Sequence, residues 1–225
     1  MKKILVVVDM QNDFIDGSLG TREAQDIVPY VAEKIRTAET EGAHIICTMD
    51  THRRSYLQTR EGKSLPVEHC IFGTNGWKLN EKILDALNSD FRRRMEFVVE
   101  RGEEEFYDNC GNDFVLFREN GEKNRCSVIA KRQFGSRQIR EEAVACIEGF
   151  SWRRPCMQIY EDDTELEFEV VGLCTDICVI TNVLMLRTCF PEAGITVDSR
   201  GCAGVTKEKH QAALEVMRSC QVNVI

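Results

Sequence analysis

Short apolar runs alternate with amphipathic stretches along most of this chain, and that alternation constrains its fold more than any other feature. The first run, Ile4–Val8, is apolar at every position, which is typical of a strand buried on both faces of a parallel sheet. From Ala24 to Ala38 the apolar residues then recur at helical spacing. Strands that alternate with helices predict βαβ units with right-handed crossovers, and therefore a mostly parallel sheet with helices on both sides.

Applied to the whole chain, this reasoning predicts a three-layer α/β/α fold of Rossmann-like type around a roughly six-stranded, mostly parallel sheet. The predicted strands are Ile4–Val8, His44–Met49, Ser127–Ala130, Leu166–Leu173, Ile195–Asp198 and Val222–Ile225. Side-chain caps at Asn80, Ser136 and Thr206 are predicted to begin three of the helices. A fourth, Asp176–Cys189, is very apolar and should be buried.

One segment, Asn88–Arg125, interrupts the alternation because it is dense in charge and its apolar pieces are short. We interpret it as an insertion, a β-hairpin that lies over the domain, since it is too small and too polar to form a domain of its own. The length of 225 residues suits one sizeable α/β domain. We therefore expect a single domain over residues 1–225 that carries an insertion at about 88–125.

Composition excludes some partners and indicates a compartment. Lys and Arg number 29 against 37 Asp and Glu, a formal net charge of −8, whereas nucleic-acid binding requires a basic face. No apolar run approaches the roughly 20 residues that cross a bilayer, and Asp9 follows Ile4–Val8 too soon for a secretion signal. The 11 cysteines form no CxxC pair, which favours free thiols in a reducing compartment. We expect a cytoplasmic protein without nucleic-acid or membrane partners.

Polar residues follow several of the predicted strands, at the place where ligands of an open parallel sheet bind. They are Asp9, Asp50 with His52, Lys131, and the turn Gly172–Cys178. Each comes from a different strand, so the fold could bring them together at one edge of the sheet. We therefore expect the functional site at this edge.

Cys178 lies at the start of a predicted helix, where the helix dipole and unpaired N–H groups would stabilise a thiolate and could bind an oxyanion. The alternative is that Cys178 is one more buried packing thiol. Asp9 is either a general base in a cleft, a solvated carboxylate at the sheet edge, or a carboxylate held by the turn Gln11–Asn12. Lys131 is either a surface group or a cation that favours both anions.

Asp50, His52 and His69 supply one carboxylate and two imidazoles. Side chains at i and i+2 after a strand can point to one side, so Asp50 and His52 could share a metal. Three protein ligands leave open positions, as in catalytic metal sites. The alternative is a surface Asp–His pair with an ordinary loop histidine.

In their order along the chain, these residues resemble a known superfamily. The motifs are Val8–Phe14, Asp50–His52, Leu65–Cys70 with Gly73-Thr74, Lys131, and Gly172–Val179. They resemble the isochorismatase-like cysteine hydrolases, and within that superfamily they are most similar to the nicotinamidase/pyrazinamidase branch. The match runs along nearly the whole chain, apart from the insertion, and implies the isochorismatase-like α/β/α fold.

The resemblance implies a catalytic triad of Asp9, Lys131 and Cys178. In the family's chemistry the cysteine thiolate attacks an amide carbonyl, the aspartate carries a proton to the departing ammonia, and water hydrolyses the thioester. The backbone N–H groups of Cys174 and Cys178 would stabilise the oxyanion, with a cis peptide bond before Cys174.

The resemblance also implies a divalent metal held by Asp50, His52 and His69, zinc first, with iron or manganese as alternatives and no organic cofactor. In nicotinamidases this metal meets the pyridine nitrogen and orients the substrate. Phe14 matches an aromatic residue that lines the ring pocket, and Leu65 takes the pocket position where the motif usually has a stacking Trp. The implied partner is a small-molecule amide, and a homo-oligomer is expected for this fold.

The match departs from the family pattern at Leu65, at Gln58, where some relatives have a further histidine, and in the insertion. The expected function is a metal-assisted cysteine amidohydrolase acting on a small carboxamide, with nicotinamide as the first candidate. One alternative is another C–N hydrolase of this fold, of the carbamoyl-sarcosine or ureidoacrylate type. The other is a catalytically silent domain used for binding or assembly.

Overall fold

The structure is a computed structural model that describes residues 1–87, 90–100, 113–120, 125–148 and 163–225. Its strands are β1 Lys2–Val8, β2 His44–Asp50, β3 Asp113–Asn120, β4 Arg125–Lys131, β5 Leu166–Leu173, β6 Gly194–Ala203 and β7 Asn223–Val224. Its α-helices are α1 Asn12–Ile15, α2 Arg22–Thr40, α3 Arg60–Ser64, α4 Glu81–Ala86, α5 Asp90–Glu100, α7 Gln138–Glu148, α8 Ile180–Cys189 and α9 Lys207–Ser219. A 3₁₀ turn, η1, covers Tyr56–Gln58, and a π-helical turn, η2, covers Thr175–Val179.

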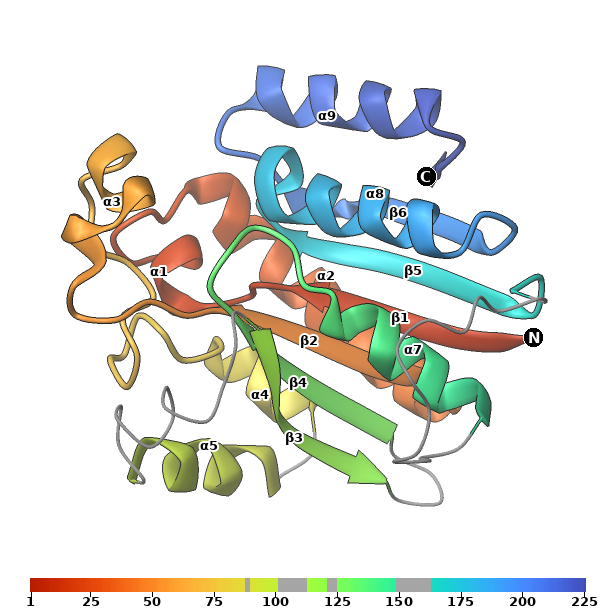
Figure 1. The fold of residues 1–225 in the computed structure, drawn as a ribbon, viewed down its shortest axis with the longest axis horizontal. Coiled ribbons are helices and arrows are strands. Elements are labelled where there is room, and N and C mark those ends of the chain that lie inside the picture. Colours follow the sequence, from red (N-terminus) through yellow and green to blue (C-terminus); the bar gives the residue numbers. More distant parts are fainter. Residues whose placement is uncertain (88–89, 101–112, 121–124, 149–162) are drawn as a thin grey trace.

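The strands form one seven-stranded sheet in the order β3-β4-β2-β1-β5-β6-β7 (Figure 1). All neighbouring strands are parallel except β3 and β4, which pair antiparallel. The predicted α/β fold with a mostly parallel sheet is confirmed, whereas the predicted count of about six strands is too low. The additional strand, β3, lies inside the segment that we interpreted as an insertion.

The continuous apolar character of β1 follows from its central place in the sheet. Leu5 and Val7 face one core cluster together with residues of α2 and α4, whereas Ile4, Val6 and Val8 face a second cluster with residues of α7, α8 and α9. Because successive side chains of a strand point to opposite faces, a strand covered on both faces has to be apolar throughout. In Figure 1, α7 and α8 lie in front of the sheet and α2 and α4 behind it.

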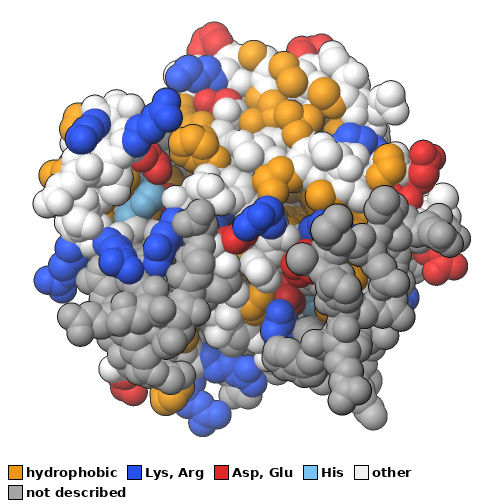
Figure 2. Space-filling model, viewed as in Figure 1, with side chains coloured by type: hydrophobic (Ala, Val, Ile, Leu, Met, Phe, Trp, Pro, Cys, Tyr) orange, Lys and Arg blue, Asp and Glu red, His pale blue; other side chains and the backbone are white. Residues whose placement is uncertain are grey.

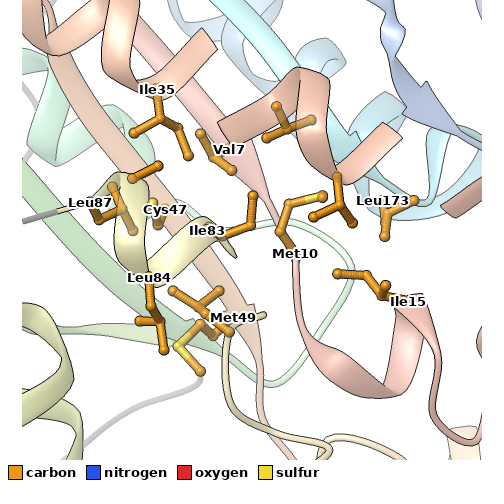
Figure 3. Packing of buried hydrophobic residues seen from close by; sticks show 14 of the residues in the cluster. Val7, Met10, Ile15, Ile35, Cys47, Met49, Ile83, Leu84, Leu87 and Leu173 are labelled. Carbon is orange, nitrogen blue, oxygen red and sulfur yellow. The ribbon is translucent and has the colours of Figure 1, made fainter. Parts of the chain in front are cut away.

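Figure 3 shows the first of these clusters, in which Val7, Cys47 and Met49 of the sheet lie opposite Ile35 of α2 and Ile83 of α4. Cys47 is fully buried there and acts as a small packing residue. The described thiols are all free, namely Cys47, Cys70, Cys126, Cys174, Cys178, Cys189, Cys202 and Cys220. The side chains of Cys110, Cys146 and Cys156 lie outside the described residues.

The predicted caps at Asn80, Ser136 and Thr206 are present. Asn80 accepts from the Lys82 N–H at 3.1 Å, and Thr206 accepts from the Lys209 N–H at 3.2 Å. Ser136 precedes α7 and accepts from the Gln138 N–H at 3.2 Å. These oxygens satisfy N–H groups that a helix leaves without partners in its first turn.

The segment 88–125 differs from the predicted hairpin. It contributes β3, which pairs with β4 as one arm of an antiparallel pair, but it also contains the helix α5. Met95 of α5 is buried against the core, whereas Phe97 is 58% exposed. The short apolar stretch Phe97–Val99 therefore belongs to a helix. Residues 88–89, 101–112 and 121–124 of this segment lie outside the described residues.

Within the described residues, no helix combines the length and the apolar character that crossing a membrane requires.

Candidate active site

The predicted site residues come together because their strands are neighbours. β4, β2, β1 and β5 are adjacent in the sheet and parallel, so their carboxyl ends meet at one edge. Asp50 and Lys131 are direct register partners at the ends of β2 and β4. Asp9 follows β1, and Cys178 lies on η2, which follows β5. The convergence that the strand ends predicted is therefore observed.

Lys131 is the centre of this arrangement. Its Nζ lies 2.7 Å from Asp9 Oδ2, 3.9 Å from Asp50 Oδ1 and 3.6 Å from Cys178 Sγ. The side chain is fully buried, which excludes the alternative of a surface lysine. Burial alone would lower the pKa of Lys131, but the charges of Asp9, Cys178 and Asp50 around it raise that pKa above its usual value. Lys131 is therefore a fixed cation between the carboxylates and the thiol.

Asp9 is fully buried and takes a left-handed backbone conformation with φ of 49°. Such a conformation costs a residue with a side chain on the order of 1–3 kcal/mol and is concentrated at functional sites. Its Oδ1 accepts from Thr48 Oγ1 at 2.7 Å. Burial raises the pKa of Asp9, and the Lys131 ammonium opposes that rise. A buried carboxylate with a raised pKa suits a general base better than it suits a solvated group at the sheet edge.

The backbone of β5 brings the turn that carries Cys178 against the end of β1. Gly172 has φ of +125°, and a Cβ at this position would overlap the carbonyl oxygen of Val8. Only glycine tolerates both that conformation and that close approach. The Leu173–Cys174 peptide bond is cis, as the resemblance implies. Cys174 is half-buried and precedes the π-helical turn η2.

Cys178 is only 5% exposed, and its environment differs from the one expected at a helix start. Burial raises the pKa of the Cys178 thiol well above its ordinary value, and the Lys131 ammonium lowers it by less. Burial therefore disfavours the thiolate of Cys178, whereas the dipole of the following helix was predicted to favour it. A thiol that attacks a carbonyl needs a group that takes its proton, and Asp9 and Cys178 share Lys131 as a neighbour.

A second cluster of side chains lies beside Lys131 and could hold a metal ion. Asp50, His52, Glu61 and His69 each direct a ligand atom into one space, with these atoms all within 4.8 Å of one another. His52 Nε2 lies 2.9 Å and His69 Nε2 3.5 Å from Asp50 Oδ2, and both lie 3.9 Å from Glu61 Oε1. Asp50, His52 and His69 are the three predicted ligands, whereas Glu61 was missed.

The chemistry of these four groups fits a divalent cation. The Nδ1 of His69 lies 2.8 Å from the Val67 carbonyl oxygen, so Nδ1 carries the proton and Nε2 offers its lone pair to the cluster. Burial and the charge of Asp50 raise the pKa of Glu61, because two carboxylates share a confined space. A divalent cation would remove that repulsion, and oxygen with imidazole nitrogen is a donor set that zinc, iron and manganese accept.

Gln11 is a further site residue that the sequence did not identify. Its side chain is fully buried. Its Nε2 donates to the carbonyl oxygens of Asp50 at 2.8 Å and Trp77 at 2.7 Å, while its Oε1 accepts from the Asp50 N–H at 2.7 Å. Two of these three hydrogen bonds hold the backbone of Asp50, which belongs to the candidate metal-binding cluster and lies beside Lys131, and the third ties that backbone to Trp77.

The two predicted pocket residues have different surroundings. Phe14 is buried, and its ring centroid lies 5.5 Å from that of His69, beside the metal cluster. Leu65 is 38% exposed, and its carbonyl oxygen accepts from Tyr56 Oη at 3.0 Å. Figure 2 shows histidine surface at the bottom of a hollow on the side of α1 and α3, with Lys and Arg side chains around it.

Comparison with known proteins supports the resemblance read from the motifs. Residues 3–97 match the family model of the isochorismatase domain, a range that contains Asp9, Asp50, His52 and His69 but neither Lys131 nor Cys178. The chain is 28% identical over 112 residues to the nicotinamidase of Saccharomyces cerevisiae (strain ATCC 204508 / S288c). That alignment covers 38% of this chain and 51% of the yeast protein, about half of its length.

Solved structures share the fold over the full chain. The pyrazinamidase of Pyrococcus horikoshii in complex with zinc matches with a TM-score of 0.65 at 20% identity, over 100% of this chain and 99% of that one. The N-carbamoylsarcosine amidase of Thermoplasma acidophilum matches with a TM-score of 0.62 at 18% identity, over 100% and 95%. The isochorismatase-like fold is thus confirmed, and so is the similarity to the nicotinamidase/pyrazinamidase branch.

Proposed function

We propose that this protein is a metal-assisted cysteine amidohydrolase that converts a small carboxamide to the acid and ammonia, with nicotinamide as the first candidate substrate. The observation that carries the proposal is the place of Lys131, whose ammonium lies 2.7 Å from Asp9 and 3.6 Å from the sulfur of Cys178. A buried acid, cation and thiol in contact have the composition of a site for nucleophilic catalysis. The similarity to a nicotinamidase supports the same chemistry.

In the proposed reaction, Asp9 takes the proton of Cys178 while the sulfur forms a bond to the amide carbon. The carbonyl oxygen becomes an oxyanion that accepts from the backbone N–H groups of Cys174 and Cys178. When this intermediate collapses, the C–N bond breaks and Asp9 returns the proton to the nitrogen, which leaves as ammonia. Lys131 keeps its charge throughout and stabilises the anionic forms of both partners.

The second half of the reaction returns the enzyme to its starting state. Asp9 takes a proton from a water molecule, whose oxygen attacks the thioester carbon. The C–S bond then breaks, the acid leaves, and the proton passes from Asp9 back to the sulfur of Cys178. The sum is one amide and one water consumed, with one acid and one ammonia formed.

Asp50, His52 and His69, together with Glu61, would hold the divalent metal, zinc first and iron or manganese as alternatives. Such an ion supplies a Lewis-acidic point that a heteroatom of the substrate can bind and thereby orient the amide. Phe14, beside His69, would line the space for the substrate ring, and Leu65 would lie at its rim. No organic cofactor takes part in this proposal.

The direct test is release of ammonia from nicotinamide and related amides by the purified protein. Cys178→Ala should reduce turnover by roughly 10³-fold or more, because the nucleophile is lost. Cys189→Ala, at an exposed cysteine at the end of α8, is the matched control and should retain full activity. Equal trace activity in wild type and both variants across an amide panel would refute the catalytic proposal.

The second candidate is a C–N hydrolase of the carbamoyl-sarcosine or ureidoacrylate type, a proposal supported by the shared fold of the N-carbamoylsarcosine amidase. Enzymes of that type do not need the metal cluster, and its four converging donors favour the nicotinamidase-like function. Metal analysis of protein prepared without chelators separates the two. A catalytically silent domain is disfavoured, since it would have no need for a buried Lys131 between Asp9 and Cys178.

The proposal also includes the setting of the enzyme, a cytoplasmic homo-oligomer without nucleic-acid or membrane partners. The net charge of −8 supports the absence of nucleic-acid partners, and the free thiols support a reducing compartment. Light scattering of the purified protein tests the oligomeric state, and a monomer at micromolar concentration would contradict it.

A further inference from the structure

Asn182 connects two parts of the site that are distant in sequence. It lies on α8, one turn beyond Cys178, and its side chain is fully buried. The amide Nδ2 donates to the Cys178 carbonyl oxygen at 2.8 Å and lies 3.4 Å from the Phe134 carbonyl oxygen as a second acceptor. Its Oδ1 accepts from the Ser136 N–H at 2.9 Å. One amide thus joins the turn of Cys178 (η2) to the loop that follows Lys131.

That loop lies between β4 and α7 and arches toward the start of α8 (Figure 1). Gly135 packs so closely on α8 that a Cβ there would lie 2.6 Å from Met185 Sδ and 2.8 Å from Thr181 Cγ2. At its far end, Ser136 Oγ donates to Asp113 Oδ2 at 2.8 Å. The loop is therefore anchored on α8 by its backbone and on β3 by a side chain.

The turn that carries Cys178, η2, has an unusual backbone geometry that hydrogen bonds from outside the turn can stabilise. η2 is a π-helical turn, in which the Val179 N–H donates to the Cys174 carbonyl oxygen at 3.1 Å. Such wide turns are uncommon within helices and occur frequently at functional sites. The Asn182 amide contacts the Cys178 carbonyl where the π turn passes into α8, and so constrains the backbone that carries the sulfur.

We propose that Asn182 is a positioning residue, whose side-chain amide fixes the loop after Lys131 against the turn of Cys178 and so sets the approach of the Lys131 ammonium to the sulfur. The 3.6 Å separation between Lys131 Nζ and Cys178 Sγ depends on β4 and η2 keeping their relative placement. The register of β4 with β2 holds one side of that pair. Asn182 hydrogen-bonds to both of the segments involved. The effect of Asn182 on turnover rests on the proposed function, whereas its effect on the placement of Lys131 relative to Cys178 does not.

The consequence concerns the reactivity of Cys178 itself. Lys131 is the cation beside this thiol, and Asp9, Asp50 and Cys174 are the other titratable groups around it, each of which disfavours the thiolate. If the loop moves away, Lys131 acts less strongly on the sulfur and the thiolate fraction at neutral pH falls. Activity and thiol reactivity should then decrease together, while substrate binding through the metal cluster is retained.

The test measures site-resolved alkylation of Cys178 by iodoacetamide with peptide mass spectrometry, over a range of pH, in the full chain. Asn182→Asp retains the shape and the acceptor for Ser136 but removes both donated hydrogen bonds. Gly135→Ala displaces the loop from α8 because the added Cβ would overlap Met185 and Thr181. Each should slow alkylation at neutral pH by about tenfold and move its pH midpoint upward. Asn223→Asp, on β7 and distant from the site, is the matched control and should react as wild type.

Turnover measurements complete the experiment. For the amide that wild type hydrolyses, kcat should fall by about tenfold in both variants with KM within about twofold of wild type. Thermal unfolding shows whether each variant is folded, and Gly135→Ala keeps the inference testable if Asn182→Asp does not fold. Unchanged Cys178 alkylation in a folded variant would overturn the positioning role. If wild type releases no ammonia from any amide, the proposed function fails, while alkylation still decides the role of Asn182.

Discussion

Asp50 and Lys131 are register partners at the ends of β2 and β4, and their carboxylate and ammonium lie 3.9 Å apart. This pair connects two groups of side chains. Asp9, Lys131 and Cys178 form one group, and the candidate metal ligands Asp50, His52, Glu61 and His69 form the other. Asp50 faces Lys131 with Oδ1 and the two histidines with Oδ2. Burial would raise the pKa of Asp50, but the Lys131 ammonium holds it well below its usual range. The Asp50 carboxylate is therefore the anion that contacts both Lys131 and the candidate metal-binding cluster.

Lys131→Met tests the central cation. The variant removes the positive charge between Asp9 and Cys178 while it retains an unbranched side chain. We expect kcat for ammonia release to fall by roughly 10²–10⁴-fold, because proton transfer loses its electrostatic support. We also expect a loss of about 3 kcal/mol in the free energy of unfolding, because buried carboxylates lose their partner. Urea unfolding measures this loss, and Lys209→Met, at an exposed lysine of α9, should change neither quantity.

Glu61→Gln tests the proposed fourth metal ligand. The variant keeps the shape of the side chain and removes a negative charge from the cluster with Asp50, His52 and His69. We expect the zinc affinity to fall by about 10- to 100-fold, as measured by competition with a chromophoric chelator. Glu33→Gln, on the exposed surface of α2, should bind zinc as wild type does. A Glu61→Gln protein that binds zinc with wild-type affinity would exclude Glu61 from the ligand set.

The sequence predicts the sheet edge where the site lies because parallel strands all end at the same edge of the sheet. Asp9, Asp50 and Lys131 each follow an apolar run, and parallel strands bring such positions together whatever their distance in sequence. Glu61 has no such signal. It lies in the first turn of a short helix, where a Glu is common, and only the path of the loop 53–59 brings it to the histidines.

The sequence did not predict that the pKa of Cys178 is raised, nor that Gln11 holds the backbone of Asp50, for a related reason. The helix-start position of Cys178 predicts a stabilised thiolate, but burial by residues of distant segments has the larger effect on its pKa. Gln11 follows Asp9 in a turn, and its hydrogen bonds to Asp50 and Trp77 exist only in the folded chain. Local pattern predicts elements and their ends, whereas desolvation and long-range hydrogen bonds depend on packing.

Asp198→Asn tests how stability depends on pH. Burial would raise the pKa of Asp198, but hydrogen bonds from Arg200, Lys34 and Tyr30 lower it well below its usual value. A lowered folded-state pKa adds stability above the unfolded-state value near 4, and that stability is lost as the pH falls. The variant should lose about 1–2 kcal/mol of unfolding free energy at about pH 7 and much less at about pH 3.

Urea unfolding at the two pH values measures this difference between Asp198→Asn and wild type. Asp26→Asn, at an exposed position of α2, controls for the change in net charge. The unfolding free energies of Asp198→Asn and wild type should become more similar as the pH falls. A difference between Asp198→Asn and wild type that is the same at both pH values would contradict the assigned role of the Asp198 carboxylate.

Gly172→Ala tests whether the approach of β5 to the end of β1 is needed for the site. Gly172 has φ of +125° against the Val8 carbonyl, whereas Gly42 has φ of +72° with nothing within 4 Å of an added Cβ. Gly42→Ala therefore reports the backbone cost alone, about 1 kcal/mol of unfolding free energy, with activity unchanged. Gly172→Ala adds a steric overlap next to Asp9 and should cost about 3 kcal/mol or more and reduce kcat by at least tenfold. Equal effects of the two variants on urea unfolding and on turnover would show that the contact between Gly172 and Val8 does not position Asp9.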